Sequence, residues 1–408
     1  MPYYCIVDVL KVSILFVLLF NANGADKNKN NERSIENASS SFSAASPLLV
    51  AGWGESRYVY EPSFLPLPPQ ANIEHAHAIV IDETDDDTII ITYKDKVDSS
   101  KCLLRWRKVT EIAELIGPSN NNDTLCKGVP HGLIIAVEDT QINVDKANRS
   151  LLTESSTAGV LYHANNEQAL HKTNMNGDII WTVKGKLKQQ SSNGHNSISN
   201  RHNTAQRKNN DNDDPYRPTW FASQPKSPYL YLADGYGSSK VYVLNKFHGN
   251  YTGHSFGGYG VDHGKFQTCH SISYDWRFNN EMVVCDRENH RLEYFRVDAL
   301  DPSVFEYSKT ISFYPLLQRP CNLRIRPLDG YAIVPFLEGS VGILNRRNDL
   351  VDVINITETL GQHGFLHPHD AHFVPGTSGD FIVVTWNPGR IGYFRRVRME
   401  EYEQSSHS

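Results

Sequence analysis

Histidine recurs at the beginning of several short segments that have the composition of β-strands. The four instances are His77 in HAHAIVID, His131 in PHGLII, His270 in CHSISYD and His369 in PHDAHF. Neutral imidazole is a common ligand for divalent metals. Three imidazoles that converge on one point and leave a further position open form the arrangement of a catalytic zinc site. The function of the chain therefore depends on whether its fold brings these histidines together.

The histidine segments belong to a unit that recurs six times along the chain. In each unit a short strand leads through a Gly-, Asp- or Asn-containing turn to a second strand and then a third. Successive units begin about fifty residues apart, except where a polar insertion separates the second unit from the third; such a period indicates a β-propeller with one blade per repeat. We therefore predict an all-β, six-bladed β-propeller around a central channel, with a sandwich as the alternative. Only residues 109–116 have the pattern of a helical turn.

The innermost strand of each propeller blade lines the channel, so residues at the same place in each unit form a ring. In blade order the ring is His77, His131, Thr219, His270, Cys321 and His369. His131, His270 and His369 lie on blades two, four and six, which are related by three-fold spacing, and we predict that they bind a divalent metal, with zinc favoured. His77 has the same register, and a histidine at the start of a strand can also serve packing or hydrogen bonding alone.

Three further side chains are expected beside such a metal. Asp370 directly follows His369, where a carboxylate could orient an imidazole, hold a second cation such as calcium, or cap a turn. Arg287, in DREN at the end of a strand, is suited to bind a substrate carboxylate through two parallel hydrogen bonds, although such a run can also be a salt-bridged turn. Tyr236, in DGYGSSK, could act as a base if a nearby cation lowers its pKa.

The two ends of the chain differ in composition from its repeats. A short apolar run followed by small residues predicts a signal peptide over 1–24, with a retained signal anchor as the alternative. Residues 25–47 and the insertion 188–214 are polar and of low complexity, so we predict a disordered leader and a disordered loop. The propeller then spans 48–397, and 398–408 form a C-terminal tail.

The signal peptide predicts a secreted protein or one of the secretory lumen, without a stable membrane span. Five Asn-x-Ser/Thr sequons are candidate glycosylation sites in that compartment: Asn37, Asn122, Asn148, Asn250 and Asn355. Among the cysteines that remain after cleavage we predict one disulfide, Cys102–Cys126, which would flank an Asn-rich loop. The formal net charge of −6, without a Lys/Arg stripe, argues against a nucleic-acid partner.

The segments DGYGSSKVYVLN, HSISYD, CDRENHRLEYF and PHD follow one another in this order along the chain. Together with PHGL and RPTW, they resemble the peptidyl-α-hydroxyglycine α-amidating lyase family, whose fold is a six-bladed propeller of NHL-type repeats. The resemblance covers most of residues 50–397. It implies a secretory enzyme that cleaves a C-terminal α-hydroxyglycine to a peptide amide and glyoxylate, using zinc held by three histidines.

The resemblance also implies roles for individual residues. The zinc ligands would be His131, His270 and His369. Tyr236 would be the general base, and Arg287 would stabilise the carboxylate of the substrate. Lys94, in ITYKD, stands where the family has a second arginine, and it keeps the charge without the planar fork. His367 stands where the family has a methionine. The partners implied are a peptide with a C-terminal α-hydroxyglycine and a separate monooxygenase that supplies it.

Two other functions fit the same fold, since propellers host many unrelated activities. The first is a non-catalytic NHL-type propeller that binds peptides or proteins through its loops, which the substituted positions Lys94 and His367 favour. The second is a different metal-assisted hydrolase, such as a lactonase. That chemistry usually relies on calcium held by oxygen ligands, and the histidine-rich ring disfavours it.

Overall fold

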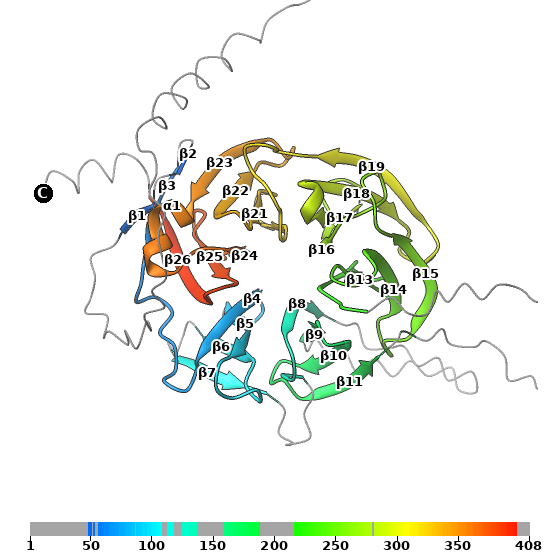
Figure 1. Cartoon of the computed structure of the whole chain (residues 1–408), viewed down its shortest axis with the longest axis horizontal. Coiled ribbons are helices and arrows are strands. Elements are labelled where there is room, and N and C mark those ends of the chain that lie inside the picture. Colours follow the sequence, from blue (N-terminus) through cyan, green and yellow to red (C-terminus); the bar gives the residue numbers. More distant parts are fainter. Residues whose placement is uncertain are drawn as a thin grey trace, which may run out of the picture. The chain divides into compact units, whose positions relative to one another are not determined.

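The computed structural model describes residues 48–50, 52–53, 56–85, 87–107, 112–117, 125–137, 159–185, 187, 216–279 and 281–397. These residues form six antiparallel sheets of four or five strands arranged around a central channel (Figure 1). The structure therefore confirms the predicted six-bladed β-propeller and excludes the sandwich.

Blades 1 to 3 each contain four described strands that follow one another outward from the channel. The strands of blade 1 are β4 (Ile73–Asp82), β5 (Thr88–Asp95), β6 (Leu103–Arg107) and β7 (Ile112–Ile116). The strands of blade 2 are β8 (Pro130–Val137), β9 (Gly159–Asn165), β10 (Ala169–Asn174) and β11 (Ile179–Lys184). The strands of blade 3 are β12 (Trp220–Ser223), β13 (Tyr229–Asp234), β14 (Lys240–Asn245) and β15 (Tyr251–Gly257).

Blades 4 to 6 have the same order, and blades 5 and 6 gain outer strands from the N-terminal part of the propeller. The strands of blade 4 are β16 (Cys269–Asp275), β17 (Glu281–Asp286), β18 (Arg291–Val297) and β19 (Phe305–Ile311). The strands of blade 5 are β20 (Arg324–Ile325), β21 (Ala332–Phe336), β22 (Ser340–Leu344), β23 (Leu350–Asn355) and β2 (Gly52–Trp53). The strands of blade 6 are β24 (Pro368–Phe373), β25 (Phe381–Thr385), β26 (Arg390–Val397), β3 (Arg57–Tyr60) and β1 (Leu48–Val50).

The ring closes in blade 6, where β3 pairs with β26 and thus joins the beginning of the propeller to its end. Tyr58 packs edge-on against Phe381 with 5.0 Å between ring centroids, and Tyr60 lies 5.6 Å from Phe394. Pairing the two ends of the repeat array removes the open edges that a linear array of blades would expose. Closure also holds the six innermost strands in place around the channel.

The central strands of the blades are apolar on both faces because each blade packs between two others. In β5, Ile89, Ile90 and Ile91 are all buried, and β13 contributes Leu230 and Leu232. Burial on both faces explains why these strands read as continuous apolar runs, without the alternation of a sheet that faces water. The core is therefore the set of spaces between blades, and the channel remains for polar side chains.

The helical prediction for residues 109–116 is wrong. Residues 112–116 form β7, which pairs antiparallel with β6, and residues 109–111 lie outside the described part. Glu114 in β7 bonds to Arg105 and Arg107 in β6, so a cross-strand ion pair reinforces the sheet. The described α-helix is instead α1 (Ile356–Leu360), with short 3₁₀ turns at Arg287–Asn289 and Gly361–His363.

Cys102 and Cys126 form the predicted disulfide. Cys269, Cys285 and Cys321 are free and buried. A structural disulfide is typical of an oxidising compartment. Within the described residues, no helix is long and apolar enough to cross a membrane. The predicted signal peptide, leader, insertion and tail lie outside the described residues and stay predictions.

Replacing both Cys102 and Cys126 with serine should lower the free energy of unfolding by about 3.5 kcal/mol. The cysteines are 24 residues apart in sequence, and a closed loop of this size restricts the unfolded chain by roughly that amount. Urea unfolding of the double variant and the parent protein, both monitored by tryptophan fluorescence, measures the difference. Equal midpoints and slopes for the two proteins would contradict the prediction.

Candidate metal centre

The innermost strands of blades 1, 2, 4 and 6 share an irregularity at their histidines. In each strand the pairing with the next strand shifts register around the histidine: between Ala76 and Ala78, Pro130 and Leu133, Cys269 and Ser271, and Pro368 and Asp370. Such a β-bulge re-aims a side chain and is common beside active sites. It directs His77, His131, His270 and His369 toward one another in the channel, where all four are buried.

Three of these imidazoles are held by the backbone of a neighbouring blade. Nδ1 of His131 lies 2.8 Å from the Thr219 carbonyl oxygen. Nδ1 of His270 lies 2.7 Å from the Cys321 carbonyl oxygen, and Nδ1 of His369 lies 2.7 Å from the His77 carbonyl oxygen. A carbonyl oxygen only accepts hydrogen bonds, so each Nδ1 carries the proton and each Nε2 presents a lone pair. Metal-binding histidines are commonly oriented in this way.

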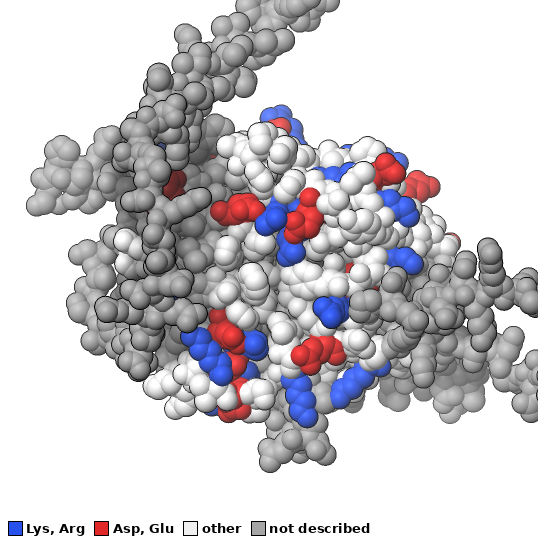
Figure 2. Space-filling model, in the orientation of Figure 1, with Lys and Arg blue, Asp and Glu red and all other residues white. Residues whose placement is uncertain are grey.

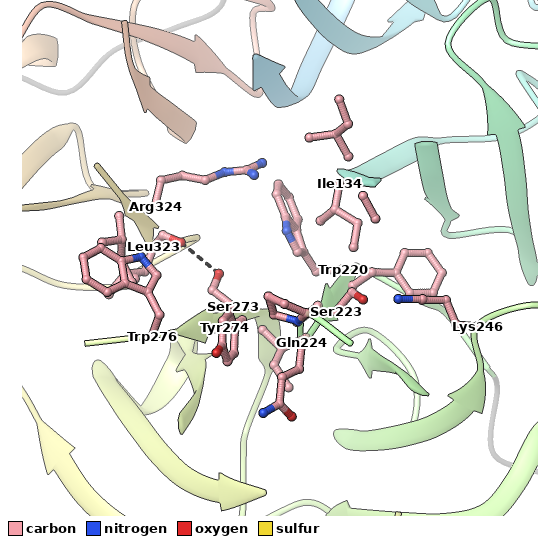
Figure 3. A pocket seen from close by; sticks show the side chains of 17 residues that line it. Ile134, Trp220, Ser223, Gln224, Lys246, Ser273, Tyr274, Trp276, Leu323 and Arg324 are labelled. Atoms are coloured by element: carbon pink, nitrogen blue, oxygen red, sulfur yellow. Dashed lines mark hydrogen bonds between the residues drawn. The ribbon is translucent and has the colours of Figure 1, made fainter. Parts of the chain in front are cut away.

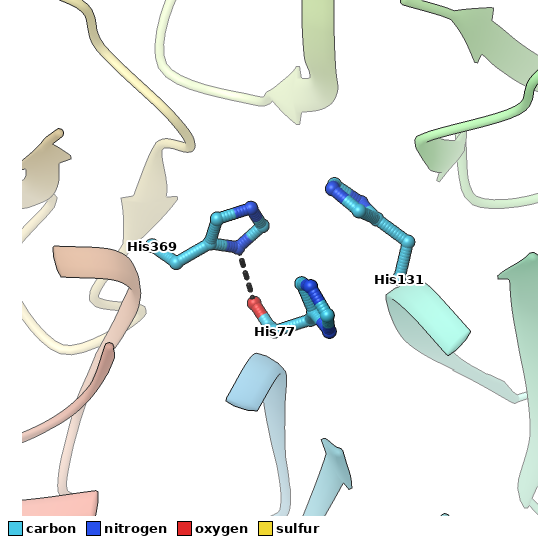
Figure 4. A group of neighbouring side chains, drawn as sticks. All are labelled: His77, His131 and His369. Atoms are coloured by element: carbon cyan, nitrogen blue, oxygen red, sulfur yellow. Dashed lines mark hydrogen bonds between the residues drawn. The ribbon is translucent and has the colours of Figure 1, made fainter. Parts of the chain in front are cut away.

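The ring centroids of His131, His270 and His369 lie 5.0, 4.7 and 4.7 Å apart. His77 joins them at 4.9 Å from His131 and 5.0 Å from His369. The potential ligand atoms of His77, His131 and His369 lie within 4.8 Å of one another (Figure 4). The rings of the three predicted ligands thus lie close together, but the group of converging ligand atoms contains His77 in place of His270. The sequence placed His77 in the ring without a metal-binding role.

Burial lowers the pKa of all four imidazoles below the usual value. The pKa of His369 falls to about 4, and the pKa values of His77, His131 and His270 also fall well below 6.5, in each case chiefly because burial penalises the charged form. Neighbouring imidazoles add to this effect for His77 and His131. The cluster is therefore neutral at pH 7, which is the form that binds a metal ion.

A cavity of about 380 Å³ opens onto the imidazoles. Its walls include His77, His131 and His369 from the cluster, while His270 does not line it. The remaining lining combines charged, polar and apolar side chains: His75, Lys94, Val129, Asn166, Tyr236, Arg287, Leu337 and Trp386. This volume suits the end of a peptide or a small molecule.

Tyr236 and Arg287 meet beside the cluster, and their predicted catalytic roles stay predictions. The Tyr236 hydroxyl lies 3.1 Å from Nε2 of His270 and accepts a hydrogen bond of 2.9 Å from the Arg287 guanidinium. Arg287 also donates to Glu288 at 2.9 Å, so one carboxylate fixes its orientation. Burial raises the pKa of Tyr236, and the nearby positive charge of Arg287 works against that rise. A metal ion beside the ring would also oppose the rise.

Lys94 lines the same cavity but is already paired. Its Nζ lies 2.7 Å from Glu74, and the two side chains are about one-third exposed, at 37% and 35%. Nδ1 of His367 donates a hydrogen bond of 3.2 Å to the Leu337 carbonyl oxygen, because a carbonyl oxygen can only accept. His367 is thereby turned to the wall of the cavity and does not belong to the group of converging ligand atoms.

Asp370 is fully buried, and donors of the protein surround its carboxylate. The backbone N–H groups of Ile79 and Ala371 and the Asn322 amide lie 2.9, 2.9 and 2.7 Å from its oxygens. Arg324 completes the shell with an ion pair of 2.9 Å. Asp370 therefore already has a cationic partner within the protein, and its hydrogen bonds among the described residues go to Ile79, Asn322, Ala371 and Arg324. The predicted roles of Asp370, beside a ligand or with calcium, stay predictions.

The same Arg324 nitrogen lies 2.7 Å from the Ile79 carbonyl and 3.3 Å from the Leu133 carbonyl. The guanidinium thus joins the inner strands of blades 1, 2 and 6 to its own blade 5. It also lies over Trp220, with 5.6 Å between the guanidinium carbon and the ring centroid (Figure 3). No sequence motif marked Arg324, because its partners come from three other repeats.

Trp220 closes the channel behind the imidazoles. Its fully buried ring lies 6.1, 6.5 and 6.5 Å from His131, His270 and His369. It also lines a second cavity, of about 400 Å³, formed by the far ends of the inner strands of blades 2 to 5 (Figure 3). The histidine cavity is therefore the mouth that gives access to the cluster.

The donor set fits a transition metal or zinc. Nε2 of His131 is buried without a hydrogen-bond partner, as is Nδ1 of His77, within the part of the chain that the structure describes. Buried polar atoms are otherwise nearly always paired. Imidazole nitrogens suit zinc and neighbouring ions, whereas calcium requires oxygen ligands. The residues present thus fit the metal that the sequence predicts, without identifying it.

Two of the five predicted glycosylation sites lie in the described part. Asn250 is partly buried before β15, and Asn355 ends β23 with its amide bonded to Glu358 and its carbonyl oxygen accepting from Ser340. Asn37, Asn122 and Asn148 lie outside the described residues. Glycosylation of these asparagines stays a prediction.

Together the fold and the site define a six-bladed β-propeller with a buried histidine cluster open to one cavity. Comparison with protein-family models and with curated proteins finds no match. Among solved structures, the chain is similar to an X-ray structure provisionally described as a gluconolactonase, with 10% sequence identity, a TM-score of 0.48, and coverage of 83% of this chain and 96% of that chain. This likeness is too distant to indicate an activity, and the resemblance to the lyase family rests on the residues alone.

Proposed function

We propose that the chain is a metal-dependent lyase that cleaves a peptidyl-α-hydroxyglycine to a peptide amide and glyoxylate. The observation that carries this proposal is the contact of Tyr236 with both His270 and Arg287 at the wall of the histidine cavity. This contact joins a phenol hydroxyl and a fixed cation beside a neutral imidazole cluster. The meeting of these two groups at one cavity supports a catalytic function over a purely binding one.

His131, His270 and His369 are suited to hold the ion, because each is locked with Nε2 unprotonated. Zinc is the ion we expect. A zinc ion bound there would supply Lewis-acid chemistry that acidifies the α-hydroxyl of the substrate. The remaining steps belong to side chains of the chain itself.

Arg287 would bind the carboxylate of the hydroxyglycine, for which its planar guanidinium provides parallel donors. Tyr236, in contact with Arg287, would take the proton of the α-hydroxyl. As the carbonyl of glyoxylate forms, the C–N bond breaks and its electron pair leaves with the nitrogen, which takes up one proton to become the amide. The hydroxyl loses one proton and the nitrogen gains one, so the reaction needs no oxidant or further reactant.

Lys94 would add positive charge to the far side of the cavity without the two-pronged geometry of arginine. Its ion pair with Glu74 lowers the charge that it offers to a substrate. A secreted chain and a separate monooxygenase that supplies the hydroxylated peptide complete the proposal. The disulfide agrees with an oxidising compartment.

The test measures metal content and glyoxylate release on one preparation of the protein. We expect about one zinc per chain and release of glyoxylate from a peptidyl-α-hydroxyglycine. His131→Ala should abolish both. The ring centroid of His131 lies 4.7 to 5.0 Å from those of the three other imidazoles, and His131 belongs both to the predicted ligand set and to the group of converging ligand atoms. His263→Ala, on an exposed histidine in the segment between β15 and β16, should change neither.

Bound zinc without glyoxylate release would contradict the lyase proposal and keep the metal centre. Absence of metal from protein refolded or expressed with zinc would favour the non-catalytic propeller, which binds peptides or proteins through its loops. Hydrolysis of a lactone that depends on the same histidines would instead favour the hydrolase alternative.

A further inference from the structure

His77 has the same backbone construction as the three predicted ligands. Its strand, β4, shifts register between Ala76 and Ala78, as the inner strands of blades 2, 4 and 6 do at their histidines. The bulge directs the His77 ring into the channel, at 1% exposure. A histidine that merely filled the core would not need the bulge, because a regular strand already buries alternate side chains.

The His77 imidazole differs from the others in its hydrogen bonds. His131, His270 and His369 each donate from Nδ1 to a backbone carbonyl of the following blade, at the residue that holds the equivalent place in the ring. The equivalent acceptor for His77 would be the His131 carbonyl, but the Thr92 hydroxyl donates to that oxygen at 2.9 Å. Nδ1 of His77 is thus left buried without a partner among the described residues. An unpaired buried nitrogen is costly unless a ligand completes it.

The cavity also distinguishes His77 from His270. His77, His131 and His369 line it, whereas the Tyr236 hydroxyl covers Nε2 of His270 at 3.1 Å. The potential ligand atoms of the three imidazoles that line the cavity lie within 4.8 Å of one another, a group that could hold a metal ion. His77 therefore lines the cavity as a candidate third ligand, and Figure 4 shows it together with the two others.

We propose that His77 is a ligand of the channel metal together with His131 and His369, and that His270 becomes the fourth ligand when the Tyr236 hydroxyl moves off its Nε2. This inference rests on the metal site of the proposed function but does not depend on its substrate. A zinc ion with four imidazoles must expand its coordination to bind a substrate oxygen, which zinc does in several catalytic sites. Four nitrogen ligands would also bind the ion more tightly than three and would favour zinc, copper or nickel over calcium.

The experiment measures the zinc dissociation constant, by competition with a chromophoric chelator, and the visible absorption spectrum of the cobalt(II)-loaded protein. The variants are His77→Ala and His77→Phe, the second of which fills the space of the ring. The control is His75→Ala. His75 lines the same cavity two residues away, and its Nδ1 is bound to the Trp386 carbonyl at 3.0 Å.

Removing only the hydrogen-bond partner of a metal-binding histidine commonly weakens metal binding by about 10- to 100-fold, and removing a ligand should cost at least as much. We therefore expect both His77 variants to weaken zinc binding by at least about a hundredfold and to change the cobalt spectrum, while His75→Ala changes neither. Unchanged affinity and spectrum in folded His77→Ala or His77→Phe would overturn the inference. Failure of the proposed function would look different: the parent protein would bind zinc through His77 and release no glyoxylate.

Discussion

Tyr236→Phe should lower the rate of glyoxylate release by about 10²- to 10⁴-fold while zinc stays bound. The substitution removes only the hydroxyl that lies between His270 and Arg287. A positioned acid or base typically contributes a rate factor of this size. The ring itself would remain, so the packing against His131, at 5.3 Å between centroids, is kept. Steady-state kinetics and elemental analysis on the same sample measure the two quantities.

Tyr242→Phe is the matched control for this experiment. Tyr242 lies in the same blade, and its hydroxyl bonds to Ser238 at 3.0 Å, away from the cavity lining. It should leave both turnover and metal content unchanged. Turnover by Tyr236→Phe equal to that of the parent protein would show that another group takes the proton. Loss of zinc from the variant would instead assign Tyr236 to holding the metal.

Arg324→Met should lower the free energy of unfolding by about 3–5 kcal/mol. Asp370 is completely buried, and removing its cationic partner leaves an uncompensated charge in the interior. The substitution also removes the donor that lies between the Ile79 and Leu133 carbonyls and so unlinks the inner strands of three other blades. Urea unfolding measures the loss, and tryptophan fluorescence reports on Trp220 directly beneath the guanidinium.

The double variant Arg324→Met, Asp370→Asn separates charge from packing. An asparagine keeps one oxygen acceptor without the charge, so it should recover a large part of the lost stability. Arg347→Met is the surface control: its ion pair with Asp349 is exposed, at 84% and 59%, and its loss should have little effect on stability. A loss in Arg324→Met as small as that in Arg347→Met would show that the buried pair does not stabilise the fold.

On the face of the molecule shown in Figure 2, basic and acidic side chains are interspersed, in keeping with the small net charge. That face therefore shows no continuous basic patch of the kind that a polyanionic partner would need.

The period of the repeats was enough to predict six blades, because each blade is built from contacts between strands that are neighbours in sequence. It also predicted the ring position of His131, His270 and His369, since equivalent residues of a closed array must face one channel. The Cys102–Cys126 disulfide could also be predicted from the sequence, because the two cysteines lie close in the chain and border one loop. The strand at residues 112–116 was missed, because pairing with β6 decided its conformation against a weak local pattern.

The amino-acid sequence by itself determined the fold, the kinds of side chain in the channel and the disulfide. Tertiary structure alone decided which nitrogen of each histidine is protonated, since the deciding carbonyls belong to other blades. It also decided that Asp370 pairs with Arg324 and that His77 is left with an unpaired nitrogen. These contacts exist only once the ring has closed, because they join strands that no local pattern relates to one another.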